Sequence, residues 1–172
     1  MLLLRRLTAW LAILWAGLFD VTQSPARYLR RALLVDLSIS MPIAIAVGLT
    51  FPSDTPDFRG MSPLFIAIMI CVVSPLVETL MMVVLFAGLR LFLKGQVPLA
   101  IVSCLLWAGL HSLSAPAWGL GVFWPFLIFS ICYLNWETRS RRHAIYMTAA
   151  LHALHNLVPS VLLLVGTAIE NQ

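Results

Sequence analysis

Four residues with hydrogen-bonding or acid–base side chains interrupt otherwise apolar stretches of the sequence: Glu78, His111, His152 and Asn156. Ionisable groups in such stretches cost roughly 2.5–3.5 kcal/mol each on membrane-insertion scales, which makes them candidates for a functional role. A Glu shielded from water is a plausible general base near neutral pH. A His or Asn donor can stabilise a developing oxyanion. If these groups meet, they can carry out acid–base chemistry on a carbonyl.

Spacing along the chain favours such a meeting. His152 and Asn156 are four residues apart and share one helix face, and His155 lies beside that face. At a helical rise of 1.5 Å per residue, Glu78, His111, His152 and Asn156 lie about 14–22 Å above the inner ends of their segments. Three separate helices are therefore expected to bring polar groups into one layer near the middle of the membrane.

The composition requires a membrane around these groups. Of 172 residues, 61% are hydrophobic and only 10% are charged, whereas soluble domains are about 25% charged. A chain of this length cannot bury so much apolar surface in its own core. The net charge of +4 does not indicate nucleic acid, because the basic residues form short clusters between apolar runs. The lipid bilayer is the expected surrounding, and no nucleic-acid partner is expected.

The apolar runs predict the elements that hold the polar groups. A spanning helix needs about 20 mostly apolar residues. We expect an all-α, polytopic membrane bundle of about five spans, with Pro75 kinking the long second span. The predicted spans are 32–51, 62–93, 97–113, 118–136 and 144–168.

The N-terminal segment and the loop charges predict the topology. Residues 1–25, with Trp10, Trp15 and Asp20, suit an amphipathic helix at the interface, leaving 26–172 as a single transmembrane domain. This arrangement places ten of the eleven basic residues on one side, which is the cytoplasmic side by the positive-inside rule. We therefore expect an inside N-terminus and an outside C-terminus, in a membrane such as the bacterial cytoplasmic membrane. Asp36, near Arg31, is expected to reach the interface as a snorkelling or paired charge.

Three short motifs resemble those of the CAAX-protease and bacteriocin-processing family of intramembrane proteases. Ser74–Thr79 resembles the first motif, in which a Pro is followed after two residues by Glu-Glu. Trp107–His111 resembles the second, an aromatic residue four before a His. His152–Asn156 resembles the third, a His and an Asn four apart. The motifs occur in the family's order and cover roughly residues 62–160.

The resemblance implies a helical bundle that encloses a polar cavity and works as a glutamic protease. It implies that Glu78, with His111, activates a water for attack on a peptide carbonyl. It also implies that His152 and Asn156 bind the oxyanion or complete the site, with His155 as a secondary member. The implied partner is a membrane-embedded or lipid-anchored peptide substrate, cleaved within the membrane or at a C-terminal signal.

The chain departs from the family pattern at three positions. Thr79 replaces the second Glu, Val83 replaces an Arg four residues further on, and Trp107 replaces the usual Phe. The first two changes remove an ion pair that could orient substrate. They keep open a non-catalytic alternative, in which the chain is a peptide-binding or immunity protein with a degenerate protease site.

A metal-dependent alternative is also open. Glu78, His111 and His152 form a two-His, one-carboxylate set of the type found in catalytic zinc sites. The family resemblance favours an enzyme without a metal or other cofactor. The sequence contains no H-E-x-x-H zinc motif and no G-x-S-x-G nucleophile elbow.

Overall fold

A computed structural model describes residues 12–54 and 60–170 of the chain, apart from the side chains at 163 and 166–170. Every regular element in the described part is a helix. In chain order these are α2 (Pro25–Thr50), α3 (Pro63–Ile68), the π-helical segment η1 (Met69–Val73), α4 (Ser74–Leu89), α5 (Gln96–Ser112), α6 (Trp118–Glu137) and α7 (Arg141–Glu170). The predicted all-α bundle is confirmed.

Three described segments have the length and composition to cross a membrane: α2, the continuous run Pro63–Leu89, and α6. The helix α5 is apolar but has only 17 residues. Three of the five predicted spans coincide with these three segments, the span 97–113 coincides with α5, and the span 144–168 coincides with α7. The protein is therefore an integral membrane protein, and five remains an approximate number of spans.

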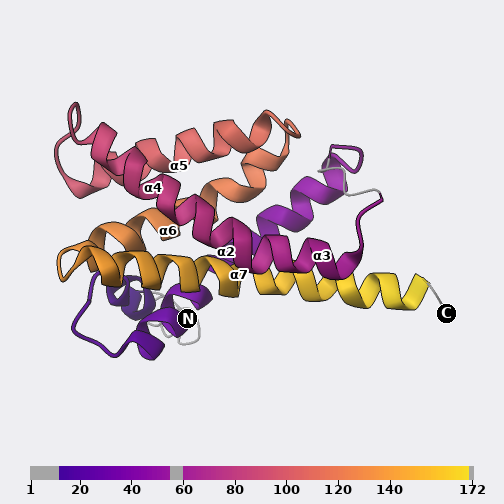
Figure 1. Cartoon of the computed structure of the whole chain (residues 1–172), viewed down its shortest axis with the longest axis horizontal. Coiled ribbons are helices and arrows are strands. Elements are labelled where there is room, and N and C mark those ends of the chain that lie inside the picture. The colour runs from indigo at the N-terminus through magenta and orange to yellow at the C-terminus, as the bar shows by residue number, and fades with distance from the viewer. Residues whose placement is uncertain (1–11, 55–59, 171–172) are drawn as a thin grey trace, which may run out of the picture.

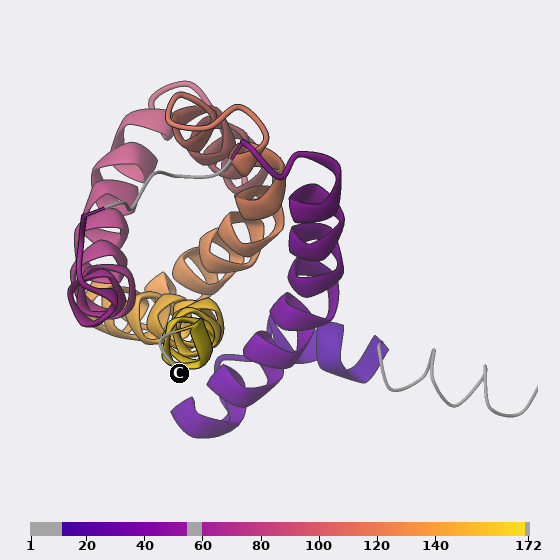
Figure 2. The same cartoon turned by 90° about the vertical axis from the view of Figure 1, so that its right-hand side faces the viewer.

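The helices lie roughly along one long axis, with α7 running to the C-terminal end of the molecule (Figure 1). Seen along that axis, α3–α4, α5, α6 and α7 follow one another around a ring, and α2 lies outside it (Figure 2). The most extensive contacts join α5 to α6 and α6 to α7, while α2 packs against both α6 and α7. The helix α6 is thus the central element of the bundle.

Aromatic side chains fill much of the core between the helices. Phe86 of α4 stacks on Tyr133 of α6, with ring centroids 5.1 Å apart. Tyr28 of α2 meets Trp136 of α6 edge to face at 5.2 Å. All four residues are almost completely buried. Such pairs add to the dispersion energy that holds helices together in lipid, where no hydrophobic effect acts between them.

Pro75 interrupts the second span, as predicted, and the structure shows the form of the interruption. Pro75 has no N–H and would clash with a carbonyl of the preceding turn in a regular α-helix. The helix widens before it: the Ser74 N–H bonds to the Met69 carbonyl, five residues back, in the π-helix η1. A π-turn of this kind often lies at a functional site.

The turn before α2 is fixed to the end of the bundle where α6 finishes. Leu18 is buried, and its carbonyl accepts hydrogen bonds from the Tyr28 hydroxyl and the Asn135 side-chain amide, each at 3.1 Å. Residues 12–17 are helical. The predicted interfacial helix also includes Trp10 and the rest of 1–11, which lie outside the described residues, so its position at the interface stays a prediction.

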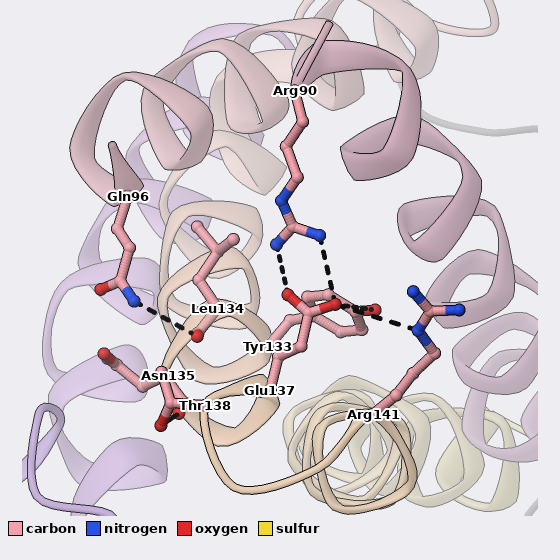
Figure 3. Close-up of polar contacts among 8 residues, drawn as sticks. All are labelled: Arg90, Gln96, Tyr133, Leu134, Asn135, Glu137, Thr138 and Arg141. Atoms are coloured by element: carbon pink, nitrogen blue, oxygen red, sulfur yellow. Dashed lines mark hydrogen bonds and ion pairs between the residues drawn. The ribbon is translucent and has the colours of Figure 1, made fainter. Parts of the chain in front are cut away.

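A charged cluster joins three helix ends at the predicted cytoplasmic side (Figure 3). Arg90, directly after α4, forms two hydrogen bonds with the Glu137 carboxylate at the end of α6. The Tyr133 hydroxyl donates to the same carboxylate at 3.3 Å, and the Arg141 guanidinium approaches it at 4.0 Å. Glu137 is thus the shared acceptor that ties α4 and α6 to the start of α7.

Replacing Glu137 by Ala is expected to lower the free energy of unfolding by about 1–3 kcal/mol, since hydrogen bonds to a charged group are lost. Thermal unfolding in detergent measures the change. Arg141→Ala is the matched control, because its side chain is 69% exposed and an exposed ion pair contributes only about 0–1 kcal/mol. Equal destabilisation by the two variants would contradict the assigned role of Glu137.

Candidate active site

A cavity of about 430 Å³ lies within the bundle, between α2, η1, α4, α5, α6 and α7. Its polar lining comes from distant parts of the chain: Glu78 of α4, His111 of α5, and His152, His155 and Asn156 of α7. Much of the remaining wall is apolar, with Phe126 and Phe129 of α6 among its residues. The structure thus brings together the five residues that the sequence assigned to the site, out of seven when the motif positions Trp107 and Thr79 are included. The other two, Trp107 and Thr79, lie outside this lining.

Glu78 projects from the first turns of α4, directly after the π-turn. The Ser74 hydroxyl, one helical turn earlier, donates a hydrogen bond to Glu78 Oε1. Glu78 Oε2 is buried and has no hydrogen-bond partner among the described residues. One carboxylate oxygen is therefore held in place, and the other is free to accept a proton.

His111 lies in the last turn of α5, where its ring is locally oriented. Its Nδ1 is 2.8 Å from the Trp107 carbonyl oxygen, one turn earlier. Because a carbonyl only accepts, Nδ1 carries the hydrogen and Nε2 is the ring nitrogen left to act as a base or acceptor. His111 is close enough to Glu78 for the two side chains to interact electrostatically.

Trp107, the aromatic residue of the second motif, holds His111 in position through its carbonyl and through Phe126. The Trp107 ring is buried and stacks on Phe126 with centroids 4.7 Å apart. Phe126 also lies 5.1 Å from the His111 ring. Trp107 thus contributes its carbonyl and its packing surface, while its indole does not line the cavity.

The helices α5 and α6 approach closely beside His111. A Cβ atom added to Gly119 of α6 would lie 2.4 Å from the Ala108 carbonyl oxygen and 2.1 Å from Ser112 Oγ. Ala108 and Ser112 flank His111 on α5. Only glycine permits this approach, so Gly119 at the start of α6 supports the site, although no motif in the sequence indicated it.

His152 lines the same cavity in largely apolar surroundings. Its side chain is 4% exposed and stacks on Phe129, with ring centroids 4.4 Å apart. Its Nδ1 is buried without a hydrogen-bond partner in the described part of the chain. His152 therefore lines the cavity with one ring nitrogen that has no hydrogen-bond partner among the described residues.

Asn156 joins α7 to the π-turn. Its Nδ2 donates to the Ile70 carbonyl oxygen at 2.8 Å. The Ser74 N–H bonds to Met69 instead, and Pro75 cannot donate, so the usual helical donors are not available to Ile70. Pro75 of the first motif thus leaves the Ile70 carbonyl without a helical donor, and Asn156 of the third motif donates to that carbonyl instead. One N–H of the Asn156 amide remains for other partners.

His155 is hydrogen-bonded to Asp36, a carboxylate that we expected from the sequence at the membrane interface. Asp36 of α2 is 0% exposed, and its Oδ2 lies 2.6 Å from His155 Nδ1. The expectation that Asp36 reaches the interface near Arg31 is therefore wrong. The Arg31 guanidinium instead donates to Gln23 Oε1 at 3.0 Å. Asp36 faces the bundle because α2 packs on α7, a contact that no local pattern indicates.

Thr79, where the family has its second Glu, does not line the cavity. It is completely buried, and its hydroxyl has no hydrogen-bond partner among the described residues. Val83, where the family has an Arg, packs against the apolar core. These two positions therefore hold no ion pair.

Comparison with protein families gives a match to the family described as type II CAAX prenyl endopeptidase Rce1-like, over residues 60–158. The match covers more than half of the chain and includes all three motifs. The chain belongs to this Rce1-like family. Comparisons with curated proteins and with solved structures gave no match. Membership in a family of membrane proteases agrees with the resemblance found in the three motifs.

Ser74 is a part of this site to which the motif alone gave no role. Ser74→Ala is expected to lower kcat for peptide cleavage by about tenfold, since loss of one hydrogen bond to a carboxylate costs about 1.5 kcal/mol. Steady-state kinetics on a cleaved peptide measure the change. The control is Ser38→Ala, whose hydroxyl bonds to Val35 within α2. An unchanged kcat in Ser74→Ala would show that Glu78 needs no support from this hydroxyl.

Proposed function

We propose that this protein is an intramembrane endopeptidase that cleaves a membrane-associated peptide or a C-terminal signal. Glu78 and His111 activate a water molecule, and the resulting hydroxide attacks the peptide carbonyl. The observation that carries the proposal is the shared cavity. Acid–base side chains from α4, α5 and α7 line one cavity in a chain of a membrane protease family.

The general base in this scheme is Glu78. Its Oε2 has no partner in the described residues, so it can accept a proton from water. His111 offers Nε2 as a second acceptor, because its Nδ1 is engaged by Trp107. A water held between two such acceptors is oriented with its oxygen lone pair toward a carbonyl carbon.

The oxyanion is assigned to α7. His152 and Asn156 line the cavity, and their N–H groups supply hydrogen-bond donors when a carbonyl oxygen becomes negative. Asn156 also keeps its bond to Ile70, which holds the start of α4 in position. The same asparagine would thus support both the oxyanion and the segment that carries Glu78.

The substrate is proposed from the size and surroundings of the cavity. A volume of about 430 Å³ is in the range of small-ligand pockets. It accommodates a short extended stretch of chain and excludes a folded domain. Because the cavity lies within a bundle of membrane-spanning helices, the substrate is a peptide embedded in or anchored to the bilayer.

The absence of an ion pair at Thr79 and Val83 supports a second candidate, a peptide-binding or immunity protein without catalytic activity. The two candidates differ in one measurement. The purified protein is reconstituted in proteoliposomes with a pool of lipid-anchored peptides, some of which carry a prenylated C-terminal Cys, and products are identified by mass spectrometry. Cleavage by wild type and not by Glu78→Gln supports the protease. Binding of pool peptides without cleavage by either protein supports the alternative.

The proposed chemistry needs no metal ion. In the described residues, no group of three His, Cys, Asp or Glu side chains has the arrangement needed to hold one. Peptide cleavage is therefore expected to keep its full rate after incubation with EDTA and 1,10-phenanthroline. Loss of activity that is restored by added Zn²⁺ would instead favour the zinc site at Glu78, His111 and His152.

The proposed orientation places the N-terminus inside and the C-terminus outside. It puts the Arg90–Glu137–Arg141 cluster at the cytoplasmic face. Asp54, whose carboxylate accepts from the Ala117 N–H at the start of α6, then lies at the outer face. The location in a bacterial cytoplasmic membrane is part of the same proposal.

A further inference from the structure

The buried carboxylate of Asp36 has no role in the chemistry described so far. It lies on α2, outside the three motifs, and its Oδ2 is 2.6 Å from His155 Nδ1. Its other oxygen, Oδ1, has no hydrogen-bond partner in the described residues. A carboxylate taken completely out of water is costly unless a partner compensates it, and this carboxylate has one partner, which lines the cavity.

The contact orients the His155 ring. Nδ1 faces a carboxylate, which only accepts, so Nδ1 carries a hydrogen and donates it to Asp36. Phe129 packs against the ring edge to face, with centroids 5.8 Å apart. The remaining polar atom of His155, Nε2, is therefore the one available to the cavity that the residue lines.

The three cavity histidines differ in the hydrogen-bond partner of Nδ1. His111 Nδ1 meets a neutral carbonyl, and His152 stacks on Phe129 with its Nδ1 unpaired. Among the described contacts, only His155 is hydrogen-bonded to a carboxylate. A negative charge at Nδ1 stabilises the positively charged imidazolium, which is the form that can give a proton away from Nε2.

We propose that His155 is the proton donor to the leaving amine and that Asp36 is the residue that positions it. This inference rests on the proposed peptidase activity. Glu78 takes one proton from water as the water oxygen bonds to the carbonyl carbon. His155 Nε2 then donates its proton to the amide nitrogen as the C–N bond breaks and the oxyanion re-forms the carbonyl. The proton on Glu78 returns to His155 through water, so the net change is one water consumed, with one carboxylic acid and one amine released.

The test compares two leaving groups on the same peptide. A peptide from the proteoliposome pool that the wild type cleaves is prepared with its scissile amide and, separately, with a thioester at that bond. An amine must be protonated to leave, whereas a thiol with a pKa of about 8.5 leaves as the thiolate. Asp36→Asn and His155→Gln are expected to lower kcat for the amide by about 10²-fold with little change in KM. Both variants should keep thioester cleavage within about threefold of wild type.

Further measurements separate a donor from a structural contact. Asp36→Asn combined with His155→Gln should lose no more amide activity than either change alone, because the two residues act as one unit. Ser40→Ala, which removes another buried polar group from α2 one turn after Asp36, should change neither substrate's rate.

Equal loss of amide and thioester cleavage in Asp36→Asn would overturn the proposal and leave the pair as a structural contact between α2 and α7. Unchanged amide cleavage would overturn it as well. If Asp36→Asn does not fold, His155→Gln gives the same comparison. Failure of the wild type to cleave any pool peptide would refute the peptidase itself, and the donor role with it. Glu-dependent cleavage in which Asp36 makes no difference would refute only the donor role.

Discussion

Glu78→Gln is expected to abolish peptide cleavage, with kcat reduced by at least about 10³-fold. Gln has nearly the same shape as Glu, and its amide can still interact with Ser74. It cannot take a proton from water, because an amide oxygen is far less basic than a carboxylate. The variant should therefore insert and fold normally, and only the chemical step should be lost. Product formation from a cleaved pool peptide, at matched protein amounts, gives the rates.

Thr79→Val is the matched control for this experiment. Thr79 is the next residue of the same helix, is completely buried, and has a hydroxyl with no partner in the described contacts. The change to Val preserves shape and removes only that hydroxyl, so the cleavage rate should match wild type. Cleavage by Glu78→Gln at the wild-type rate would refute Glu78 as the base, whatever the control shows.

Gly119→Ala is the second substitution for which we expect a large effect. The added methyl group would lie 2.4 Å from the backbone oxygen of Ala108. The Ser112 side chain can rotate away, but the Ala108 carbonyl can move only with α5. Separating α5 from α6 is expected to cost about 1–3 kcal/mol of stability, as other overpacked cores do. It should also move His111 away from Glu78 and lower kcat by about 10²-fold, the usual effect of a 1 Å displacement in an active site.

Gly109→Ala serves as the comparison for Gly119→Ala. Gly109 is also a helical glycine near His111, but an added Cβ there meets no atom within 4 Å. The change should leave both thermal unfolding and kcat near wild type, or raise stability slightly, because Ala favours a helix over Gly. If Gly109→Ala reduced activity as much as Gly119→Ala, the close approach of α5 and α6 at Gly119 would not explain the loss.

The sequence alone was sufficient to predict the helices and most of the polar residues that line the cavity. Long apolar runs require spanning helices because backbone polar groups cannot remain unpaired in lipid. Rare ionisable residues in those runs, such as Glu78 and His111, carry an insertion cost that indicates a common polar site. The break in the second span followed from the missing N–H of Pro75. These inferences succeed because each depends on local chemistry or on the membrane as solvent.

Only the tertiary structure decided which polar groups are partners. Asp36 is five residues after Arg31 in the sequence, yet it bonds to His155, which is 119 residues away in the chain. Asn156 donates to the Ile70 carbonyl, 86 residues earlier, which lacks a helical donor because of Pro75. Gly119 is required by the distance between two helices and not by its own backbone conformation. Each of these contacts depends on how α2, η1, α5, α6 and α7 pack against one another. Helix packing is determined by side chains on several segments at once, so no single stretch of sequence carries that information.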